Sequence, residues 1–188
     1  MVIKDQKINQ FLASLASKKP TPGGGATAAL AGAMAASLVS MVAKLSVDKD
    51  KKFKEIEGKA DELRKDLLKL ADEDCQAYEG VMKAYRIDKR ESGRLRKVQK
   101  ALKKAAEIPL ETAQKAVGVV KLASFCAREG NQNATSDARC GIELATAAVY
   151  GALENVRINL ESIKDSKFNN EIGDEMDGLL ECEDLKSG

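Results

Sequence analysis

The chain has 188 residues, which is enough for one domain with a full hydrophobic core. Charged residues make up 32% of it, aromatic residues 4%, and tryptophan is absent, a balance that favours a helical bundle over a β-sandwich. The net charge of +2 gives no indication of a nucleic-acid or membrane partner.

The sequence contains no histidine, and this limits its chemistry. Catalysis by serine–histidine or cysteine–histidine pairs is excluded, and acid–base work falls to Asp, Glu, Lys, Tyr or Cys. The cysteines are widely spaced and form no CxxC pair, so we expect no metal site. No signal peptide is visible, so we expect a cytoplasmic protein with free thiols at Cys75, Cys126, Cys140 and Cys182.

Residues 20–25, Pro-Thr-Pro-Gly-Gly-Gly, form the most distinctive segment. It follows a predicted amphipathic helix that ends near Lys18, and it leads into a second helix from about Ala26 to Leu45. The prolines stiffen the segment, and the glycines permit unusual dihedrals and close approach of another group. The free N–H groups at the start of the second helix would favour a carboxylate, a phosphate or a polar ring edge.

The sequence argues against two other interpretations of this region, a nucleotide phosphate site and a membrane span. The spacings GxxxxGK[ST] and GxGxxG are both absent and no strand precedes the glycines, which disfavours a nucleotide phosphate site. The second helix is apolar almost all round and could be a membrane span. Its apolar run of about 18 residues is at the short limit for spanning, and it consists mostly of Ala, Gly and Ser. A buried central helix is therefore favoured.

A third helix carries an apolar seam with alternating spacings of three and four residues, interrupted by one acid, Asp74. Burial would raise the pKa of this carboxyl, and a carboxyl nearer neutrality can both accept and donate a proton. Alternatively, Asp74 pairs with a basic residue or an amide on a facing helix and only specifies register. Asp72 and Glu73 lie off the seam, and we expect them in solvent. The seam comprises Phe53, Ile56, Ala60, Leu63, Leu67, Leu70, Asp74, Ala77, Val81 and Ala84.

The rest of the chain is also helical in pattern. A basic, polar segment after Tyr85 leads to a fourth helix over 95–107 and a fifth over 109–128, with Pro109 in its first turn. Residues 130–137 form a second loop that ends in a predicted N-cap, Ser136, and a first-turn acid, Asp137. A sixth helix to about Ile163 and a short last helix over 168–179 follow. No strand pattern, repeat or linker is seen, so we predict one all-α domain, a bundle of long antiparallel helices.

Asn155 and Asn159 lie four residues apart on one face of the sixth helix. Their amides offer both donors and acceptors and would suit the edge of a heterocycle. They could equally form an interhelical hydrogen-bonded pair. The basic segment, which extends from Arg86 to Lys104 and so into the fourth helix, is typical of a solvated face, although it could attract a polyanionic tail.

Four segments together resemble the cyclodeaminase/cyclohydrolase family of folate enzymes, which includes the C-terminal half of formiminotransferase-cyclodeaminase and stand-alone methenyltetrahydrofolate cyclohydrolases. They are residues 20–25 with their Ala-rich helix, 74–78 (Asp-Cys-Gln-Ala-Tyr), 130–137, and 155–160 (Asn-Val-Arg-Ile-Asn-Leu). The resemblance covers nearly the whole chain in the family's order. It implies an all-helical fold that pairs into homodimers, and a tetrahydrofolate substrate without a metal.

The resemblance also assigns roles. The family's catalytic acid maps to Asp74, the residue that the seam had singled out. Ala26 stands where the family often has Ser, and Thr27 could supply the missing hydroxyl. The expected substrate-binding residues are Gly23, Gly24, Gly25, Thr27, Asn131, Ser136, Asp137, Asn155 and Asn159.

The first functional hypothesis is a cyclodeaminase that converts 5-formiminotetrahydrofolate to 5,10-methenyltetrahydrofolate and ammonia, with Asp74 as the proton shuttle. We expect no formiminotransferase module on the chain, so a separate formiminotransferase is an expected partner. A methenyltetrahydrofolate cyclohydrolase that uses the same pocket is the alternative. A helical folate-binding or assembly protein without catalysis is the alternative of another class.

Overall fold

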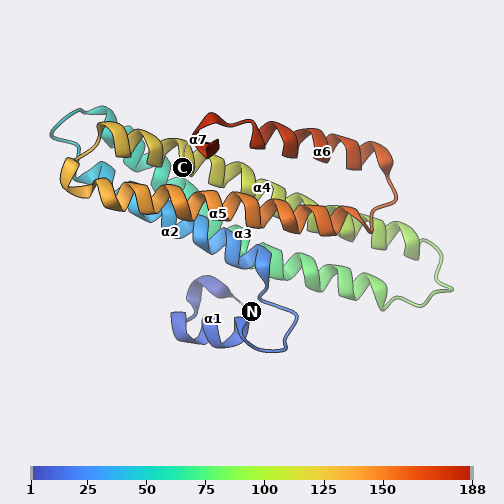
Figure 1. Cartoon of the computed structure of the whole chain (residues 1–188). Coiled ribbons are helices and arrows are strands. Elements are labelled where there is room, and N and C mark those ends of the chain that lie inside the picture. The colour runs from blue at the N-terminus through green and yellow to red at the C-terminus, as the bar shows by residue number, and fades with distance from the viewer. Residues whose placement is uncertain (1, 187–188) are drawn as a thin grey trace.

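The computed structural model describes residues 2–186, and within this range it contains α- and 3₁₀-helices and no β-strand. Four long helices lie side by side, each antiparallel to its neighbour in the chain (Figure 1). They are α2 (Gly24–Lys44), α3 (Lys52–Tyr85), α4 (Arg94–Glu129) and α5 (Thr135–Leu160). The prediction of an all-α bundle of long antiparallel helices is confirmed.

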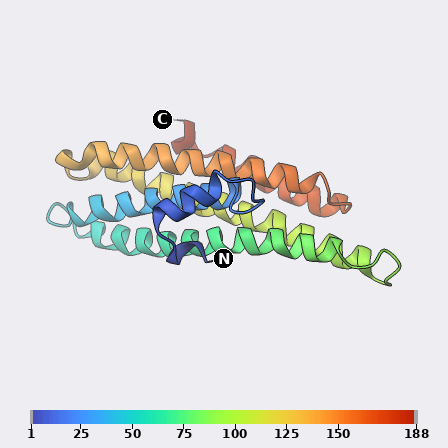
Figure 2. The ribbon, with the colours of Figure 1, turned by 90° about the horizontal axis from the view of Figure 1, so that it is seen from below.

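The N-terminal segment lies across one side of the bundle (Figure 2). It contains the 3₁₀-helix η1 (Ile3–Asp5), which packs on α3, and α1 (Ile8–Leu15). The backbone N–H of Ile3 donates a hydrogen bond to Asp72, which is 7% exposed. We expected Asp72 in solvent, and this is wrong because η1 covers it.

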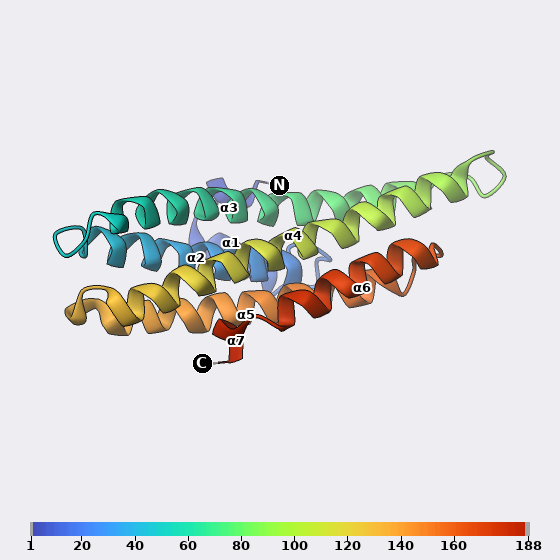
Figure 3. The ribbon, with the colours of Figure 1, turned by 90° about the horizontal axis from the view of Figure 1, so that it is seen from above.

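The C-terminal segment lies on another side, where α6 (Ser166–Leu180) runs along α4 (Figure 3). The last helix was predicted at this place. A further turn, α7 (Glu183–Lys186), also contacts α4 and was not anticipated. The 3₁₀-helix η2 (Gln132–Ala134) lies between α4 and α5.

Helix α2 is the central helix, packed against α3, α4 and α5. Its small side chains allow close packing: a Cβ at Gly32 would lie only 3.2 Å from Leu67 Cδ1 and 3.5 Å from the Cβ of Ala148. The helix is long and apolar enough to cross a membrane, but 61% of its most apolar stretch is buried inside the bundle. The predicted buried central helix is confirmed.

Pro109 does not start a new helix. The sequence predicted two helices at this place, but α4 continues unbroken from Arg94 to Glu129 with Pro109 inside it. A proline removes the N–H that would bond to the carbonyl four residues earlier, here Ala105. The side chain of Asn159 supplies that bond instead, with Nδ2 2.8 Å from the Ala105 oxygen. A side chain from α5 thus pairs the carbonyl that Pro109 leaves without a donor, and α4 continues through the proline.

Three predicted helix ends also shift. Helix α2 begins at Gly24 rather than near Ala26, so two of the glycines form its first turn. Helix α5 begins at Thr135 after Ala134, which makes no side-chain cap, so Ser136 is not the N-cap, while Asp137 does lie in the first turn. Helix α1 ends at Leu15, before the predicted Lys18. Element ends are the part of a helix that the pattern of apolar residues locates least well.

The long helices differ in length, and this difference determines what surrounds the N-terminus of α2. Helix α2 has 21 residues, whereas α3 has 34 and α4 has 36. Because α2 starts partway along the bundle, α3, α4 and α5 continue beyond its N-terminus (Figure 1). The loop that precedes α2 enters at this point.

Leu67 tests the packing of the core, because it is fully buried and lies against Gly32. We expect Leu67→Ala to lower the free energy of unfolding by about 2–5 kcal/mol, through lost burial and the cavity left behind. Leu95→Ala is the control, since Leu95 is 59% exposed, and its effect should stay within about 0.5 kcal/mol. Chemical denaturation measures both, and equal losses would contradict this packing.

Candidate functional site

A cavity of about 440 Å³ lies at the N-terminus of α2, within the usual size range of small-molecule sites. Its walls come from the proline–glycine loop, the second half of α3, the first half of α4 and the end of α5. We call it the Asp74 pocket. It is lined by Pro20, Thr21, Gly23, Gly24, Gly25, Asp74, Ala77, Tyr78, Val81, Met82, Tyr85, Leu102, Ala105, Asn155, Ile158, Asn159 and Ser162.

The carboxyl group of Asp74 packs directly against Gly25. A Cβ added to Gly25 would overlap Asp74 Oδ1 and would lie 2.7 Å from Cγ, closer than real Cβ contacts come. Gly25 does not need unusual dihedrals, because Gly93 is the one residue with positive φ in the described part of the chain. The glycine is therefore required for space, and the sequence argument from unusual dihedrals is wrong.

Burial raises the pKa of Asp74, and a hydrogen bond from the Ala26 backbone N–H partly opposes this rise. That N–H is one of the free donors at the start of α2, where the helix dipole also favours negative charge. The carboxyl is thus poised to exchange a proton while it faces the pocket. No salt bridge holds it within the described part of the chain, so the alternative in which it pairs with a basic residue loses its support.

Asn155 lies against the next glycine of the loop. A Cβ at Gly24 would be 3.2 Å from Asn155 Nδ2, so this glycine also gives space to a polar side chain. Asn155 Nδ2 donates a hydrogen bond of 2.7 Å to the carbonyl of Gly151, one turn earlier in α5. Its carbonyl oxygen Oδ1 remains for another donor.

Asn159 lies one turn further along α5 and also lines the pocket. Its Nδ2 is engaged by the Ala105 carbonyl, as described above. The two asparagines do not bond to one another; each bonds to a backbone carbonyl. The structure therefore brings Asp74, Asn155, Asn159 and the glycine loop together, as the sequence analysis expected.

Thr27 occupies a less direct position. Its hydroxyl donates to the Gly23 carbonyl at 2.8 Å, closing the first turn of α2, and it does not line the pocket. The structure thus gives Thr27 a role in the shape of the loop. Its predicted contact with a substrate stays a prediction.

The second loop does not reach the pocket of the same chain. Asn131 bonds through its side chain to the Leu45 carbonyl and to the Asn133 N–H, at the other end of the bundle. Ser136 and Asp137 begin α5, whereas Asn155 lies near its end, about 28 Å away at 1.5 Å per residue. A role for these residues in the Asp74 pocket would require a second copy of the chain.

The predicted homodimer stays a prediction. Helix α2 and the residue after it expose large apolar side chains: Met34 is 54% exposed, Met41 38% and Leu45 54%. Exposed apolar surface of this kind is a common feature of interfaces.

Sequence reasoning missed the apolar lining of the pocket. Tyr78, Tyr85 and Ile158 are partly exposed and give flat or apolar surface on which a ring could pack. Tyr78 lies four residues after Asp74, on the same face of α3. That spacing was a signal that could have identified it.

Cys75 follows Asp74 but takes no part in the pocket. It is 4% exposed, and burial, together with the charges of Asp74 and Asp72, raises the pKa of its thiol to about 11. A thiol that stays protonated is a poor nucleophile at neutral pH. Cys75 is therefore not a candidate nucleophile for this pocket.

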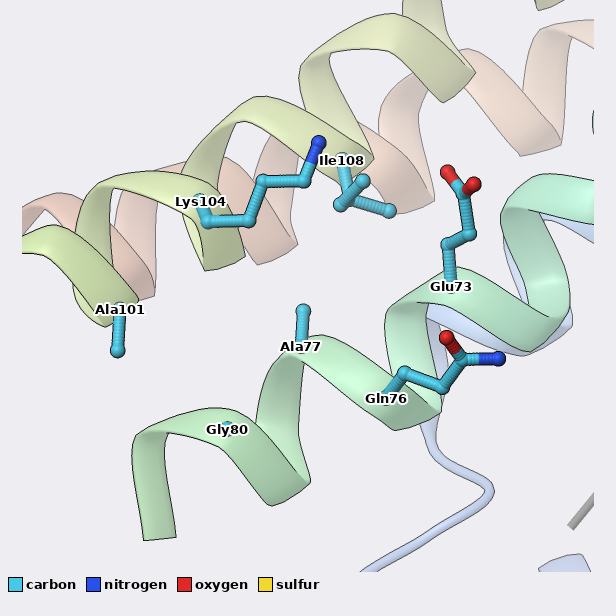
Figure 4. A pocket seen from close by; sticks show the side chains of 7 residues that line it. All are labelled: Glu73, Gln76, Ala77, Gly80, Ala101, Lys104 and Ile108. Atoms are coloured by element: carbon cyan, nitrogen blue, oxygen red, sulfur yellow. The ribbon is translucent and has the colours of Figure 1, made fainter. Parts of the chain in front are cut away.

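A second cavity of about 270 Å³ lies between α3 and α4 (Figure 4). It shares Ala77 with the Asp74 pocket and contains one member of the basic segment, Lys104. Its acid, Glu73, pairs with Lys69 at 3.1 Å. Other basic residues nearby are also paired, such as Lys103 with Asp165 at 2.6 Å. The Asp74 pocket is the stronger candidate because it combines a buried acid with free polar atoms.

Comparison with known proteins agrees with the fold. The family described as Formiminotransferase-cyclodeaminase matches residues 7–178. The solved structure of formiminotetrahydrofolate cyclodeaminase from Thermotoga maritima is 30% identical, with a TM-score of 0.88 over 98% of this chain and 92% of that one.

Two curated relatives extend the comparison. The methenyltetrahydrofolate cyclohydrolase of Methylorubrum extorquens is 38% identical over 94% of this chain and 89% of its own length. The formimidoyltransferase-cyclodeaminase of Gallus gallus is 30% identical over 93% of this chain, but the match spans only 34% of that longer protein.

The contact between Gly25 and Asp74 can be tested by adding one methyl group. Gly25→Ala should lower the free energy of unfolding by about 1–3 kcal/mol, because the new Cβ displaces the buried carboxyl. Gly23→Ala is the matched control, since its Cβ would meet nothing closer than 3.8 Å. Chemical denaturation measures both, and a Gly25→Ala chain as stable as the Gly23→Ala chain would contradict the contact.

The pKa of Asp74 makes stability depend on pH. Because the folded-state pKa is raised, the folded chain holds this proton more tightly than the unfolded chain. The stabilising contribution is complete below the unfolded pKa of about 4 and is lost as pH rises through the folded pKa. Asp74→Asn should therefore raise the melting temperature at pH 7 and leave it nearly unchanged at pH 3. If Asp74→Asn raises the melting temperature equally at both pH values, the burial of charge is not the cause of the increase.

Proposed function

Because the chain belongs to the formiminotransferase-cyclodeaminase family, we propose that the Asp74 pocket binds a tetrahydrofolate derivative and that Asp74 transfers a proton there. One observation carries the proposal: Asp74 is the sole charged side chain among the described residues that line the pocket. The 5,10-methenyl group of folate is a cation, and an unpaired acid without Lys or Arg neighbours suits it.

The first candidate reaction is hydrolysis of 5,10-methenyltetrahydrofolate. Water attacks the methenyl carbon, and the Asp74 carboxylate accepts a proton from that water. One carbon–nitrogen bond then breaks, the released nitrogen keeps the electron pair and takes up the proton of the hydroxyl group, and the carbon remains on the other nitrogen as a formyl group. The reaction releases one proton overall, so a base beside the carbon is what it needs. The cyclohydrolase that is 38% identical over most of both chains supports this candidate.

The second candidate is cyclodeamination of 5-formiminotetrahydrofolate. Folate N10 attacks the formimino carbon on N5, ammonia leaves, and the methenyl bridge forms. The attacking nitrogen loses a proton and the leaving nitrogen gains one, so a single carboxyl with a raised pKa serves both transfers. The Thermotoga maritima structure, with its TM-score of 0.88, supports this candidate.

The other polar groups of the pocket orient the substrate in this proposal. The oxygen atoms of Asn155 and Asn159 accept hydrogen bonds from a ring edge, while the Tyr78 and Tyr85 rings pack on its face. The backbone N–H of Ala26, in the first turn of α2, holds Asp74 in place. Binding energy is thus used to place the reacting carbon beside the carboxyl.

Asp74→Asn tests the proton transfer. The variant should bind tetrahydrofolate within a few-fold of the original chain and lose turnover by about 10²–10⁴-fold, the usual contribution of general acid–base catalysis. Glu73→Gln is the matched control: the neighbouring acid lines the other cavity, and its loss should leave turnover unchanged. Near-normal turnover in Asp74→Asn would remove Asp74 from the mechanism.

The same assays separate the candidates. Loss of methenyl absorbance without ammonia release indicates the cyclohydrolase, and ammonia release from 5-formiminotetrahydrofolate indicates the cyclodeaminase. Tight folate binding without turnover of either substrate would leave the non-catalytic helical protein as the answer.

A further inference from the structure

Pro109 and Asn159 are linked through one backbone carbonyl. In an unbroken helix the N–H of residue 109 would bond to the carbonyl of Ala105, and proline has no such N–H. Both residues of α4 are buried, with Ala105 8% exposed. A buried carbonyl left without a donor is costly, so the free Ala105 oxygen attracts the Asn159 amide. The observed bond from Nδ2, at 2.8 Å, is this pairing.

This bond fixes which end of the Asn159 amide faces the pocket. An asparagine side chain carries donors on one atom and an acceptor on the other. With Nδ2 engaged by Ala105, the acceptor Oδ1 is left, and no group among residues 2–186 donates to it. Both Ala105 and Asn159 line the pocket, so the orientation is set at its wall.

Asn155 repeats the arrangement one turn earlier. Its Nδ2 is engaged by the Gly151 carbonyl at 2.7 Å, and its Oδ1 is also left over. This second bond lies within α5 and does not involve Pro109. The end of α5 therefore carries two side chains with free acceptor oxygens in the lining of the Asp74 pocket, and a ligand edge that carries N–H donors is complementary to them.

We propose that Pro109 is a positioning residue for substrate recognition: by withholding its N–H, it keeps Asn159 turned with its acceptor toward the ligand. Pro109 does not line the pocket and acts through Asn159. The identity of the ligand rests on the proposed function, in which the amino-pyrimidinone edge of the pterin carries the donors. The link between Pro109 and Asn159 rests on the geometry of this chain alone.

Pro109→Ala tests the role in recognition. The restored N–H bonds to Ala105, which frees the Asn159 amide to rotate and present its donors. We expect the Kd of tetrahydrofolate and the KM of the substrate to rise about three- to tenfold, with kcat at saturation within twofold and no loss of melting temperature. Because both changes act on one contact, Pro109→Ala should weaken binding much less in an Asn159→Ala background. Unchanged binding in a folded variant, or fully additive losses, would overturn the proposal.

Melting temperatures test the link without any ligand. Asn159→Asp keeps the size of the side chain but removes the donor, so it should lower the melting temperature by several degrees. In a Pro109→Ala background, where the N–H of residue 109 replaces that donor, the loss should be at least halved. Asn155→Asp is the matched control, and it should lower the melting temperature by the same amount in both backgrounds. If Asn159→Asp lowers the melting temperature equally in the original and the Pro109→Ala backgrounds, Pro109 does not act on Asn159.

The melting-temperature experiment does not depend on the proposed function. If the original chain binds no tetrahydrofolate, the proposed function fails, while the melting cycle still decides whether Pro109 holds Asn159. A Pro109→Ala chain that cannot fold would count against the link, because a restored helical hydrogen bond should strengthen α4. In that event the single variants of the original chain still decide. If Asn159→Asp lowers the melting temperature no more than Asn155→Asp does, the Ala105 carbonyl does not depend on the Asn159 donor.

Discussion

The site depends on one contact, in which the Asp74 carboxyl is buried against the backbone of Gly25 at the start of α2. Removing a carboxyl from water opposes its ionisation, and the Ala26 N–H at the helix N-terminus partly offsets that cost. The group is therefore neither a solvated surface acid nor half of an ion pair. Its raised pKa is a property shared by many proton-transfer groups.

The bundle around this contact supplies both rigidity and space. Small residues let α2 pack closely in the centre, as Gly32 does against Leu67. Because α2 is shorter than α3 and α4, these longer helices continue past it and help to enclose a cavity next to its N-terminus. The site thus arises where a helix begins inside a bundle, and rigid helices on three sides hold its side chains.

Much of the fold and part of the site were predictable. The heptad-like seam located α3 and singled out Asp74 as its one acid, and the i,i+4 spacing placed Asn155 and Asn159 on one face. That α4 continues through Pro109 was not predictable from the sequence. Proline often begins a helix, and here the carbonyl that it leaves without a donor is paired by a side chain from another helix. Similarly, nothing local shows that Asp72 is covered by the N-terminal segment.

The amino-acid sequence by itself determined the all-α class, the buried character of α2 and the family, since these depend on periodicity, composition and local motifs. Only the tertiary structure decided why the glycines are needed and which residues share the pocket. Gly24 and Gly25 make room for Asn155 and Asp74, whereas Asn131 lies at the far end of the bundle. The physical reason is that contacts between helices depend on their relative lengths and starting points, which no single segment encodes.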